Sequence, residues 1–400
     1  MTGPLPLDRT PPVTRSELTA GFPFEHLSRW PLPDSAGAQG YDAADLLLLD
    51  TVQAWLDAGH APDPQPPLVV LEDRHGALTL PLLAAGHPVR VGQDALAAER
   101  SLEANRAGWG SPLPGSLDRG PLGPALLDGA RLVVLALPRA LDALEQWAWL
   151  VAEHAADDVV LLAGGRDKHM TPRQNTVLGR YFASVVPGRG RSKSRVLTAR
   201  GPRRGLPAPF PRTAVRRLPG LGAVTLAAHG ATFGGTAVDP GTGFLLEHLD
   251  APGPRAVDVG CGNGTIALFL ALRARREGRE ATVVATDQSA DACASTALTA
   301  ELNGVAGAVQ VRRDDALASF PDAGEDLLVL NPPFHDFHAV DARVALRLFD
   351  AAARVLRPGG TLWCVWNSHL RYRSELERRV GPTRQVARDR TYTVTVSTRR

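Results

Sequence analysis

The residues best suited to chemistry are Asn331, Pro332, Pro333 and Phe334, which directly follow 327–330, an apolar run typical of a buried strand. The two prolines fix the backbone and donate no hydrogen bonds, so nearby carbonyl groups remain available as acceptors. With the side-chain oxygen of Asn331, they can accept both hydrogens of a planar –NH₂ group and stabilise the positive charge that grows as it attacks an electrophile. Phe334 can stack on a flat substrate, and a base presented in this way has left its stack or comes from a single strand. The structural alternative is a rigid turn, for which Asn-Pro is common.

A second stretch is suited to hold the molecule that supplies the electrophile. Residues 256–259 predict a short buried strand, and the apolar residues after 264 predict a helix. Glycines in such a turn let the backbone bend and a ligand approach, and the first N–H groups of the helix are available to that ligand. The turn between strand and helix reads G-x-G-x-G, which is not the G-x-G-x-x-G of the dinucleotide fingerprint. Its residues are Gly260, Cys261, Gly262, Asn263 and Gly264.

Two acidic residues beside this turn favour a nucleoside that carries an ammonium group. Asp258 would repel a pyrophosphate, but it would attract the ammonium group of S-adenosylmethionine. Asp287 ends the next predicted strand, 282–287, where a doubly wound sheet places a ribose-binding carboxylate. The alternative for both acids is a helix cap or a solvated loop position.

Strands and helices alternate through the second half, which predicts a mostly parallel sheet with ligands at the carboxyl ends of its strands. Asp239, before Pro240, predicts a helix start. Further helices are expected at 290–302, from 341 to 357 and at 375–380, and further strands at 308–312, 361–366 and 391–397.

The first half repeats this pattern in degraded form. Residues 69–82 align with 257–270, but Glu72 and Arg74 stand in place of Gly260 and Gly262, and these bulky residues would close the turn against a ligand. Likewise, 132–138 aligns with 327–333, and Ala136 stands where the second half has Asn331. We infer a duplication whose first copy kept its strands and lost its polar chemistry.

Composition sets further bounds on the protein. A chain of 400 residues predicts two domains, and no apolar run is long enough to span a membrane. The three cysteines have no metal-ligand spacing, and their odd number argues against a disulfide framework and for a reducing cytosol. The net charge of +2 is small, but 189–217 is densely basic and contains no acids. It is either a solvated interdomain linker or a surface for the phosphate backbone of a nucleic acid.

Several of these residues together resemble the motifs of class I S-adenosylmethionine-dependent methyltransferases that act on exocyclic amino groups. They are Asp258 to Gly264, Asp287, the pair Asp314 and Asp315, and Asn331 to Phe334. The degenerate first half, His335 and the run 367–372 are similar to the bacterial ribosomal RNA guanine-N2 methyltransferases, the small-subunit methyltransferase C and large-subunit methyltransferase G group. Phe337 replaces a glycine of many small-subunit members, and 335–340 is similar to large-subunit members as well. The resemblance therefore leaves open whether the RNA of the small or of the large subunit is methylated.

The resemblance implies two tandem Rossmann-like α/β methyltransferase domains. Residues 1–205 would form the degenerate, non-catalytic copy that assists folding and RNA binding, 206–230 a basic linker, and 231–400 the catalytic domain. Catalysis would fall to Asn331, Pro332, Pro333 and Phe334. Cofactor binding would fall to Asp258, Gly260, Cys261, Gly262, Asn263, Gly264, Asp287, Gln288, Asp314, Asp315, Ala316 and Asn331. Contacts with substrate RNA would fall to His335, Phe233, Asp239, Arg203, Arg204 and Lys168.

We therefore expect methyl transfer from S-adenosylmethionine to the N2 amine of a guanine in ribosomal RNA, with 16S rRNA favoured over 23S rRNA. The enzymatic alternative is a methyltransferase of adenine N6 or of protein glutamine, and the non-enzymatic one is an RNA-binding assembly factor. An NAD-dependent oxidoreductase fits least, given the glycine spacing and Asp258. We expect a cytoplasmic monomer whose partner is ribosomal RNA or a ribosomal subunit, with no metal and no membrane association.

Overall fold

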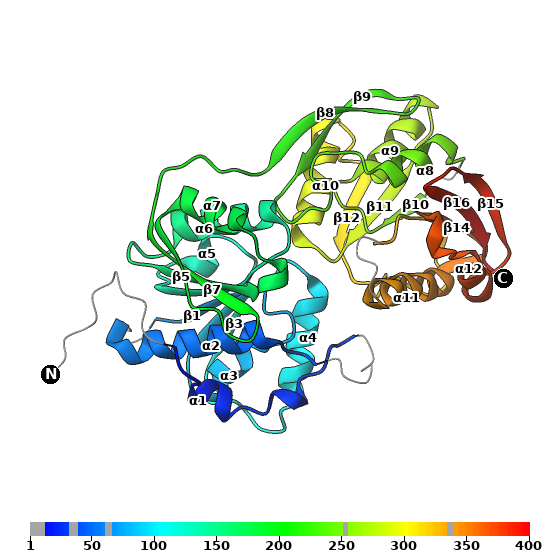
Figure 1. Cartoon of the computed structure of the whole chain (residues 1–400). Coiled ribbons are helices and arrows are strands. Elements are labelled where there is room, and N and C mark those ends of the chain that lie inside the picture. Colours follow the sequence, from blue (N-terminus) through cyan, green and yellow to red (C-terminus); the bar gives the residue numbers. More distant parts are fainter. Residues whose placement is uncertain (1–12, 32–38, 61–65, 251–254, 334–338) are drawn as a thin grey trace. The chain divides into compact units, whose positions relative to one another are not determined.

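The computed structural model describes residues 13–31, 39–60, 66–250, 255–333 and 339–400 (Figure 1). The chain divides into two compact units, Met1–Pro209 and Phe210–Arg400, called unit 1 and unit 2 below. Over the described residues, each unit is built on a seven-stranded sheet, and unit 2 has an additional two-stranded sheet.

Unit 1 has the strand order β3-β2-β1-β4-β5-β7-β6, with β7 antiparallel to both neighbours and the other pairs parallel. Its strands are β1 (Leu68–Leu71), β2 (Val89–Gly92), β3 (Leu117–Arg119), β4 (Leu132–Ala136), β5 (Val160–Arg166), β6 (Phe182–Pro187) and β7 (Ser194–Pro202). Its helices are α1 (Glu17–Ala20), α2 (Ala43–Trp55), α3 (Thr79–Ala84), α4 (Leu96–Ala107), α5 (Pro124–Leu127), α6 (Leu141–His154) and α7 (Pro172–Tyr181).

Unit 2 has the equivalent order, β12-β11-β10-β13-β14-β16-β15, with β16 antiparallel to both neighbours. Its strands are β8 (Arg212–Leu218), β9 (Gly222–Ala228), β10 (Arg255–Val259), β11 (Thr282–Asp287), β12 (Val309–Arg313), β13 (Glu325–Leu330), β14 (Leu356–Asn367), β15 (Thr383–Arg388) and β16 (Tyr392–Thr398). Its helices are α8 (Pro240–His248), α9 (Thr265–Arg276), α10 (Ala290–Leu302), α11 (Ala339–Val355) and α12 (Arg373–Arg379).

The two sheets also share their strand register. Val69 of β1 pairs with Val133 of β4, and the aligned residue Val257 of β10 pairs with Leu328 of β13. The sequence repeat had aligned Val69 with Val257 and Val133 with Leu328. The expected fold class, two tandem Rossmann-like α/β units from a duplication, is confirmed by the common strand order and register.

The central strands of unit 2 are covered on both faces, which explains their continuous apolar sequence. Ala256, Leu327 and Val329 join one core cluster with residues of α9, whereas Val257 and Leu328 join the other with residues of α11. Because successive side chains alternate between the faces, each helix packs on its own side of the sheet.

Residues 206–230, for which a basic linker is expected, contain the β8–β9 hairpin. The hairpin is attached to α10, since the N–H groups of Thr225 and Ala227 donate to the side chains of Asn303 and Thr299 at 3.0 Å each. Sequence reasoning missed β8, because three of its seven residues are arginines and only Leu218 is buried. Sequence reasoning also missed β15, a polar edge strand of Thr-Arg-Gln-Val-Ala-Arg.

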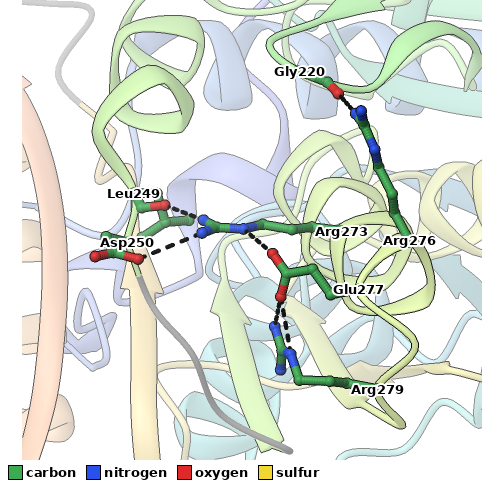
Figure 2. Close-up of polar contacts among 7 residues, drawn as sticks. All are labelled: Gly220, Leu249, Asp250, Arg273, Arg276, Glu277 and Arg279. Carbon is green, nitrogen blue, oxygen red and sulfur yellow. Dashed lines mark hydrogen bonds and ion pairs between the residues drawn. The ribbon is translucent and has the colours of Figure 1, made fainter.

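The basic last turn of α9 holds neighbouring segments through their backbone carbonyls. Figure 2 shows Arg276 donating to the carbonyl of Gly220 in the β8–β9 turn, and Arg273 donating to the carbonyl of Leu249 after α8. Glu277 accepts from Arg273 at 2.9 Å and also pairs with Arg279. These arginines serve the fold, so arginine content alone does not mark a nucleic-acid surface in this chain.

Candidate active site

Three adjacent strands of unit 2 end side by side at one edge of the sheet. Val259 of β10 pairs with Thr286 of β11 and with Leu330 of β13. The residues that follow these positions are Gly260, Asp287 and Asn331. The sheet register therefore brings together the glycine turn, the second acid and the Asn-Pro-Pro segment.

The Asn331 amide is held by the start of α8. Its Nδ2 donates to Asp239 Oδ2 at 2.8 Å and to Thr242 Oγ1 at 2.9 Å. A carboxylate can only accept, so this contact identifies the nitrogen side of the amide. Asn331 Oδ1 is buried and has no hydrogen-bond partner within the described residues. The site thus contains the free acceptor that binding of an –NH₂ group requires.

Asp239 is the N-cap of α8, and the same Oδ2 accepts from the N–H of Thr242 at 2.9 Å. An aspartate cap followed by proline at the first helical position is a favourable local start for a helix. Since α8 packs on β14 and β16, this start lies at the sheet edge although Asp239 precedes Asn331 by 92 residues. The sequence indicated the cap, but not its contact with Asn331.

Of the remaining expected catalytic residues, Pro332 is buried and Pro333 is exposed. Phe334 and the expected RNA-contacting residue His335 lie outside the described residues. Phe233 is 55% exposed.

The loop that follows Phe233 is fixed by the glycine turn, because Asn263 Nδ2 donates to the carbonyl groups of Gly235 and Ala237 at 2.9 and 2.8 Å. Asn263 Oδ1 accepts from the N–H and the hydroxyl of Thr265. The side chain of Asn263 therefore holds the loop between Phe233 and Asp239 in place.

The three glycines of the turn all have positive φ, but they face different surroundings. At Gly260 and Gly262, with φ of 75° and 55°, no heavy atom lies within 4 Å of the place a Cβ would occupy. At Gly264, a Cβ would stand 3.1 Å from the Cα of Thr296 in α10. The first two glycines leave open space for a ligand, whereas the third permits helix packing.

Asp258 is fully buried beneath this turn, at 0% exposure. Its Oδ2 accepts from the N–H of Ala267 at 3.0 Å, so it caps the start of α9, and Oδ1 has no partner within the described residues. Burial, with a smaller contribution from the charge of Asp287, raises the pKa of Asp258 to about 7. An unpaired buried carboxylate oxygen is energetically costly, and a bound cation nearby would offset that cost.

Asp287 connects the end of β11 to the glycine turn. It accepts from the N–H of Gly262 at 3.1 Å and from the N–H of Ser289 at 3.0 Å. Burial raises its pKa. Burial also raises the pKa of the Cys261 thiol, whose sulfur accepts from the Thr296 hydroxyl at 3.2 Å, so Cys261 is a packed thiol rather than a nucleophile. Gln288 is exposed.

Asp314 and Asp315, which follow β12, both have hydrogen-bond partners within unit 2. Asp314 accepts from the N–H groups of Ala318 and Ser319 and shapes the following turn. Asp315 forms a two-point ion pair with Arg347 of α11, at 2.7 and 2.8 Å. Ala316 has a φ of 51°, in the left-handed region. Sequence reasoning missed Arg347, which no local motif connects to Asp315.

The expected RNA contacts Lys168, Arg203 and Arg204 belong to unit 1. Lys168 is exposed. Arg203 donates to the carbonyl of Gly179 at 3.2 Å. Arg204 donates to the carbonyl groups of Glu153 and Ala155 at the end of α6, where it serves as a helix cap.

The basic stretch 189–217 contains several other arginines with structural contacts. Arg191 pairs with Asp50, and Arg200 lies over the ring of Trp55. Arg216 donates to the carbonyl of Thr236 at 3.0 Å. Several of the arginines that made this stretch prominent in the sequence therefore contact residues of the unit to which they belong.

In unit 1 the equivalent turn carries two carboxylates that accept hydrogen bonds within the unit. Glu72 stands in place of Gly260, and its Oε1 accepts from the N–H of Asp94 at 2.7 Å across the ends of β1 and β2. Asp73 accepts from the N–H groups of Leu78 and Thr79 at the start of α3. Ala136, the last residue of β4, has no side-chain amide. The described residues of unit 1 thus lack the acceptor that Asn331 supplies in unit 2.

In the part of the chain that the structure describes, no helix is long and apolar enough to cross a membrane. No group of three or more His, Cys, Asp or Glu side chains there could hold a metal ion.

Comparisons with known proteins match both units. Residues 223–396 match the Methyltransferase small domain, and residues 15–203 match the RLMG N-terminal domain. The chain is 34% identical to the ribosomal RNA large subunit methyltransferase G of Streptomyces coelicolor, over 92% of this chain and 96% of that protein. It is 31% identical to the protein of the same name from Streptomyces avermitilis, over 92% and 95%.

Among solved structures, the chain resembles a T. thermophilus 16S rRNA N2 G1207 methyltransferase in complex with AdoMet and guanosine. The TM-score is 0.73 at 24% identity, covering 94% of this chain and 99% of that one. At this identity, the likeness establishes the fold of the whole two-unit chain.

Proposed function

The chain belongs to the ribosomal RNA large subunit methyltransferase G family, and from that premise we propose that it methylates the exocyclic N2 amine of a guanine in large-subunit ribosomal RNA. The expected class, an rRNA methyltransferase that uses S-adenosylmethionine, agrees with this membership. The preference for 16S rRNA is not confirmed, because the family is named for the large subunit. The observation that carries the proposal is the buried Oδ1 of Asn331 beside the glycine turn, which has no hydrogen-bond partner among the described residues.

The residues around the turn fit S-adenosylmethionine. The open space at Gly260 and Gly262 would admit its methionine portion. Asp258 is fully covered, so we propose that it attracts the ammonium group through the local field of a low-dielectric site. Asp287 would accept from the ribose hydroxyls, and Asp315 with Ala316 would lie by the adenine. When bound, S-adenosylmethionine supplies a methyl carbon whose bond to sulfur breaks as its bond to the amine nitrogen forms.

The chain's own residues act on the amine. Asn331 Oδ1 and a carbonyl of the Pro-Pro segment accept the two N–H groups, which fixes the nitrogen for attack. The Asn331 amide is already held by Asp239 and Thr242, so its oxygen stabilises the growing positive charge on nitrogen without reorganisation. No side-chain base is required, because the surplus proton passes to water. Phe233, exposed on a loop held by Asn263, offers an aromatic surface for a base.

We propose that unit 1 contributes to folding and to RNA binding, and that the enzyme acts as a monomer in the cytoplasm on ribosomal RNA or a subunit. We favour Lys168 among the expected unit 1 contacts, because Arg203 and Arg204, although also exposed, donate to backbone carbonyl groups of unit 1. A contact of this kind would add affinity without base specificity.

The test is methyl transfer from labelled S-adenosylmethionine to separately purified large-subunit and small-subunit ribosomal RNA, followed by mass analysis of the nucleosides. We expect N2-methylguanosine in large-subunit RNA. N6-methyladenosine, transfer to a glutamine of a protein, or labelling of small-subunit RNA alone would contradict the proposal. An Asn331→Ala variant should bind S-adenosylhomocysteine normally and transfer no methyl group, and wild-type activity in this variant would remove Asn331 from the mechanism.

A further inference from the structure

We propose that Asp239 and Thr242 are positioning residues that fix the amide of Asn331 and strengthen its oxygen as an acceptor. The inference rests on the proposed function and assigns Asp239 a role different from the RNA contact expected from the sequence. Asn331 Nδ2 donates to Asp239 Oδ2 at 2.8 Å and to Thr242 Oγ1 at 2.9 Å, so both of its hydrogens are used.

These contacts prevent the amide from turning over. Rotation by half a turn would set Asn331 Oδ1 against Asp239 Oδ2, and neither oxygen carries a hydrogen to donate. The repulsion would act in a partly buried site, where it is screened less than in water. Oδ1 therefore remains on the side away from α8, as a buried acceptor with no partner among the described residues.

The charge of Asp239 adds a second effect. A hydrogen bond to an ionised group is stronger than a neutral one, and linked hydrogen bonds polarise each other. Donation from Nδ2 to the carboxylate increases the negative charge on Oδ1 of the same amide. Because the amine nitrogen becomes positive only as it attacks, this stabilisation is greater in the transition state than in the ground state. The expected consequence is a change in kcat rather than in substrate affinity.

The start of α8 is constructed to hold the carboxylate in this position. Asp239 Oδ2 also accepts from the N–H of Thr242 at 2.9 Å, and Pro240 occupies the first helical position. Thr242 is 6% exposed, so its hydroxyl has few rotamers available. Through its N–H and its hydroxyl, Thr242 therefore contacts both members of the Asp239–Asn331 pair.

Four variants separate geometry from charge. Asp239→Asn keeps an acceptor oxygen and removes the charge, whereas Asp239→Ala removes both. Thr242→Val removes the hydroxyl acceptor at nearly constant volume, and Thr242→Ser restores it. Asp42→Ala is the matched control, because Asp42 is likewise the N-cap of a helix, α2 of unit 1, and accepts from the N–H of Ala44 at 2.6 Å.

The experiment measures kcat and KM with protein-free large-subunit ribosomal RNA, and the Kd of S-adenosylhomocysteine by calorimetry. Loss of a direct transition-state contact lowers kcat by about 100- to 1,000-fold. For these indirect residues we expect a fall of roughly 100-fold in Asp239→Ala, and of roughly 10-fold in Asp239→Asn and Thr242→Val. KM, Kd and the rate of Thr242→Ser should stay within about threefold of wild type, and Asp42→Ala should lower only the Tm.

Wild-type kcat in both Asp239 variants would overturn the inference while leaving the proposed function intact. So would an equal loss of kcat in Asp42→Ala, or a loss that appears in Kd instead of kcat. A wild-type enzyme that methylates no ribosomal RNA would overturn the proposed function and this inference with it.

Discussion

Glu72 and Gly260 have the same left-handed backbone conformation, with φ of 65° and 75°, at equivalent positions of the two sheets. The N–H of Glu72 donates to the carbonyl of Gly92, and the N–H of Gly260 donates to the carbonyl of Thr286. Gly92 and Thr286 occupy equivalent positions, paired with the last residues of β1 and β10. Unit 1 has thus retained the backbone conformation of this turn, with a glutamate at the position where Gly260 leaves open space in unit 2.

Placing each of these two residues at the other's position should distinguish the effect of backbone strain on stability from the effect of the side chain on ligand binding. We expect Gly260→Glu to abolish binding of S-adenosylhomocysteine, and to lower the free energy of unfolding by about 1–2 kcal/mol because of its positive φ. In Glu72→Gly, relief of that strain offsets the loss of the hydrogen bond to Asp94, worth about 0.5–1.5 kcal/mol. Calorimetry on Glu72→Gly should still show one bound ligand per chain. A second bound ligand per chain would mean that Glu72 alone prevents unit 1 from binding S-adenosylhomocysteine.

Stability should depend on pH through Asp258. Folding raises its pKa from 3.8 to about 7, so the folded state holds the proton more tightly. Between these pH values the folded protein binds more protons than the unfolded one, so the unfolding free energy falls as pH rises and levels off above the folded pKa. Burial also raises the pKa of Asp73 and Asp287, with the same sign, so the quantity to measure is the difference in Tm between wild type and Asp258→Asn. This difference should favour the variant more at pH 8 than at pH 5.

The same carboxyl group predicts that cofactor binding releases protons. A positive ligand near Asp258 favours its ionised form and lowers its pKa, so binding at pH 6 should release protons and tighten as pH rises to 8. Calorimetry with S-adenosylmethionine in two buffers of different ionisation enthalpy measures this release. Equal release from Asp258→Asn would assign the proton to another group.

The ion pair between Arg347 and Asp315 should matter for both stability and binding. Asp315 is 5% exposed, so Arg347→Ala leaves a nearly buried carboxylate without its two-point partner. Removing the partner of a buried charge costs about 3–5 kcal/mol, and we expect roughly half of that because the Arg347 side chain is 33% exposed. Loss of the Arg347 contact should also let the Asp315 carboxylate rearrange, which would weaken binding of S-adenosylhomocysteine.

Arg255→Ala is the matched control for Arg347. Arg255 forms a two-point pair with Glu325, which is 1% exposed, at the opposite ends of β10 and β13 from the glycine turn. Its removal should lower the Tm by a comparable amount while the Kd stays unchanged. A similar loss of affinity in both variants would show that the effect is general destabilisation.

Two residues of unit 1 should differ in their effect on RNA binding. Lys168→Ala removes an exposed charge, so it should weaken binding of RNA of any sequence and reduce the salt slope by about 1 if the lysine meets a phosphate. Arg204→Ala should instead lower the Tm, because Arg204 caps α6 and pairs with Asp157. Filter binding across a salt series, with the Tm of each variant, measures both effects. An unchanged salt slope for Lys168→Ala would place the RNA elsewhere.

Local sequence was sufficient to predict most of the helices and strands of unit 2. The strand 282–287 and the helix 290–302 were predicted with the bounds that β11 and α10 have, because an apolar run and the Asn303-Gly304 stop after the helix are local signals. The repeat in the sequence predicted a duplication, and the residues it aligned occupy equivalent register positions in the two sheets. By contrast, β8 and β15 carry many arginines and few buried side chains, so their pairing depends on neighbours that sequence does not supply.

The sequence by itself determined which residues are available for chemistry: a glycine turn, two acids at strand ends, and an asparagine before two prolines. Only the tertiary structure decided how each is used. Asp239 lies 92 residues before Asn331, and the two meet because α8 packs at the edge where β13 ends. Likewise, the sequence shows Arg204 only as part of a basic stretch, whereas in the structure its side chain caps the end of α6. Periodicity and capping are read from adjacent residues, whereas hydrogen-bond partners distant in the chain are fixed only when the sheet brings its strands together.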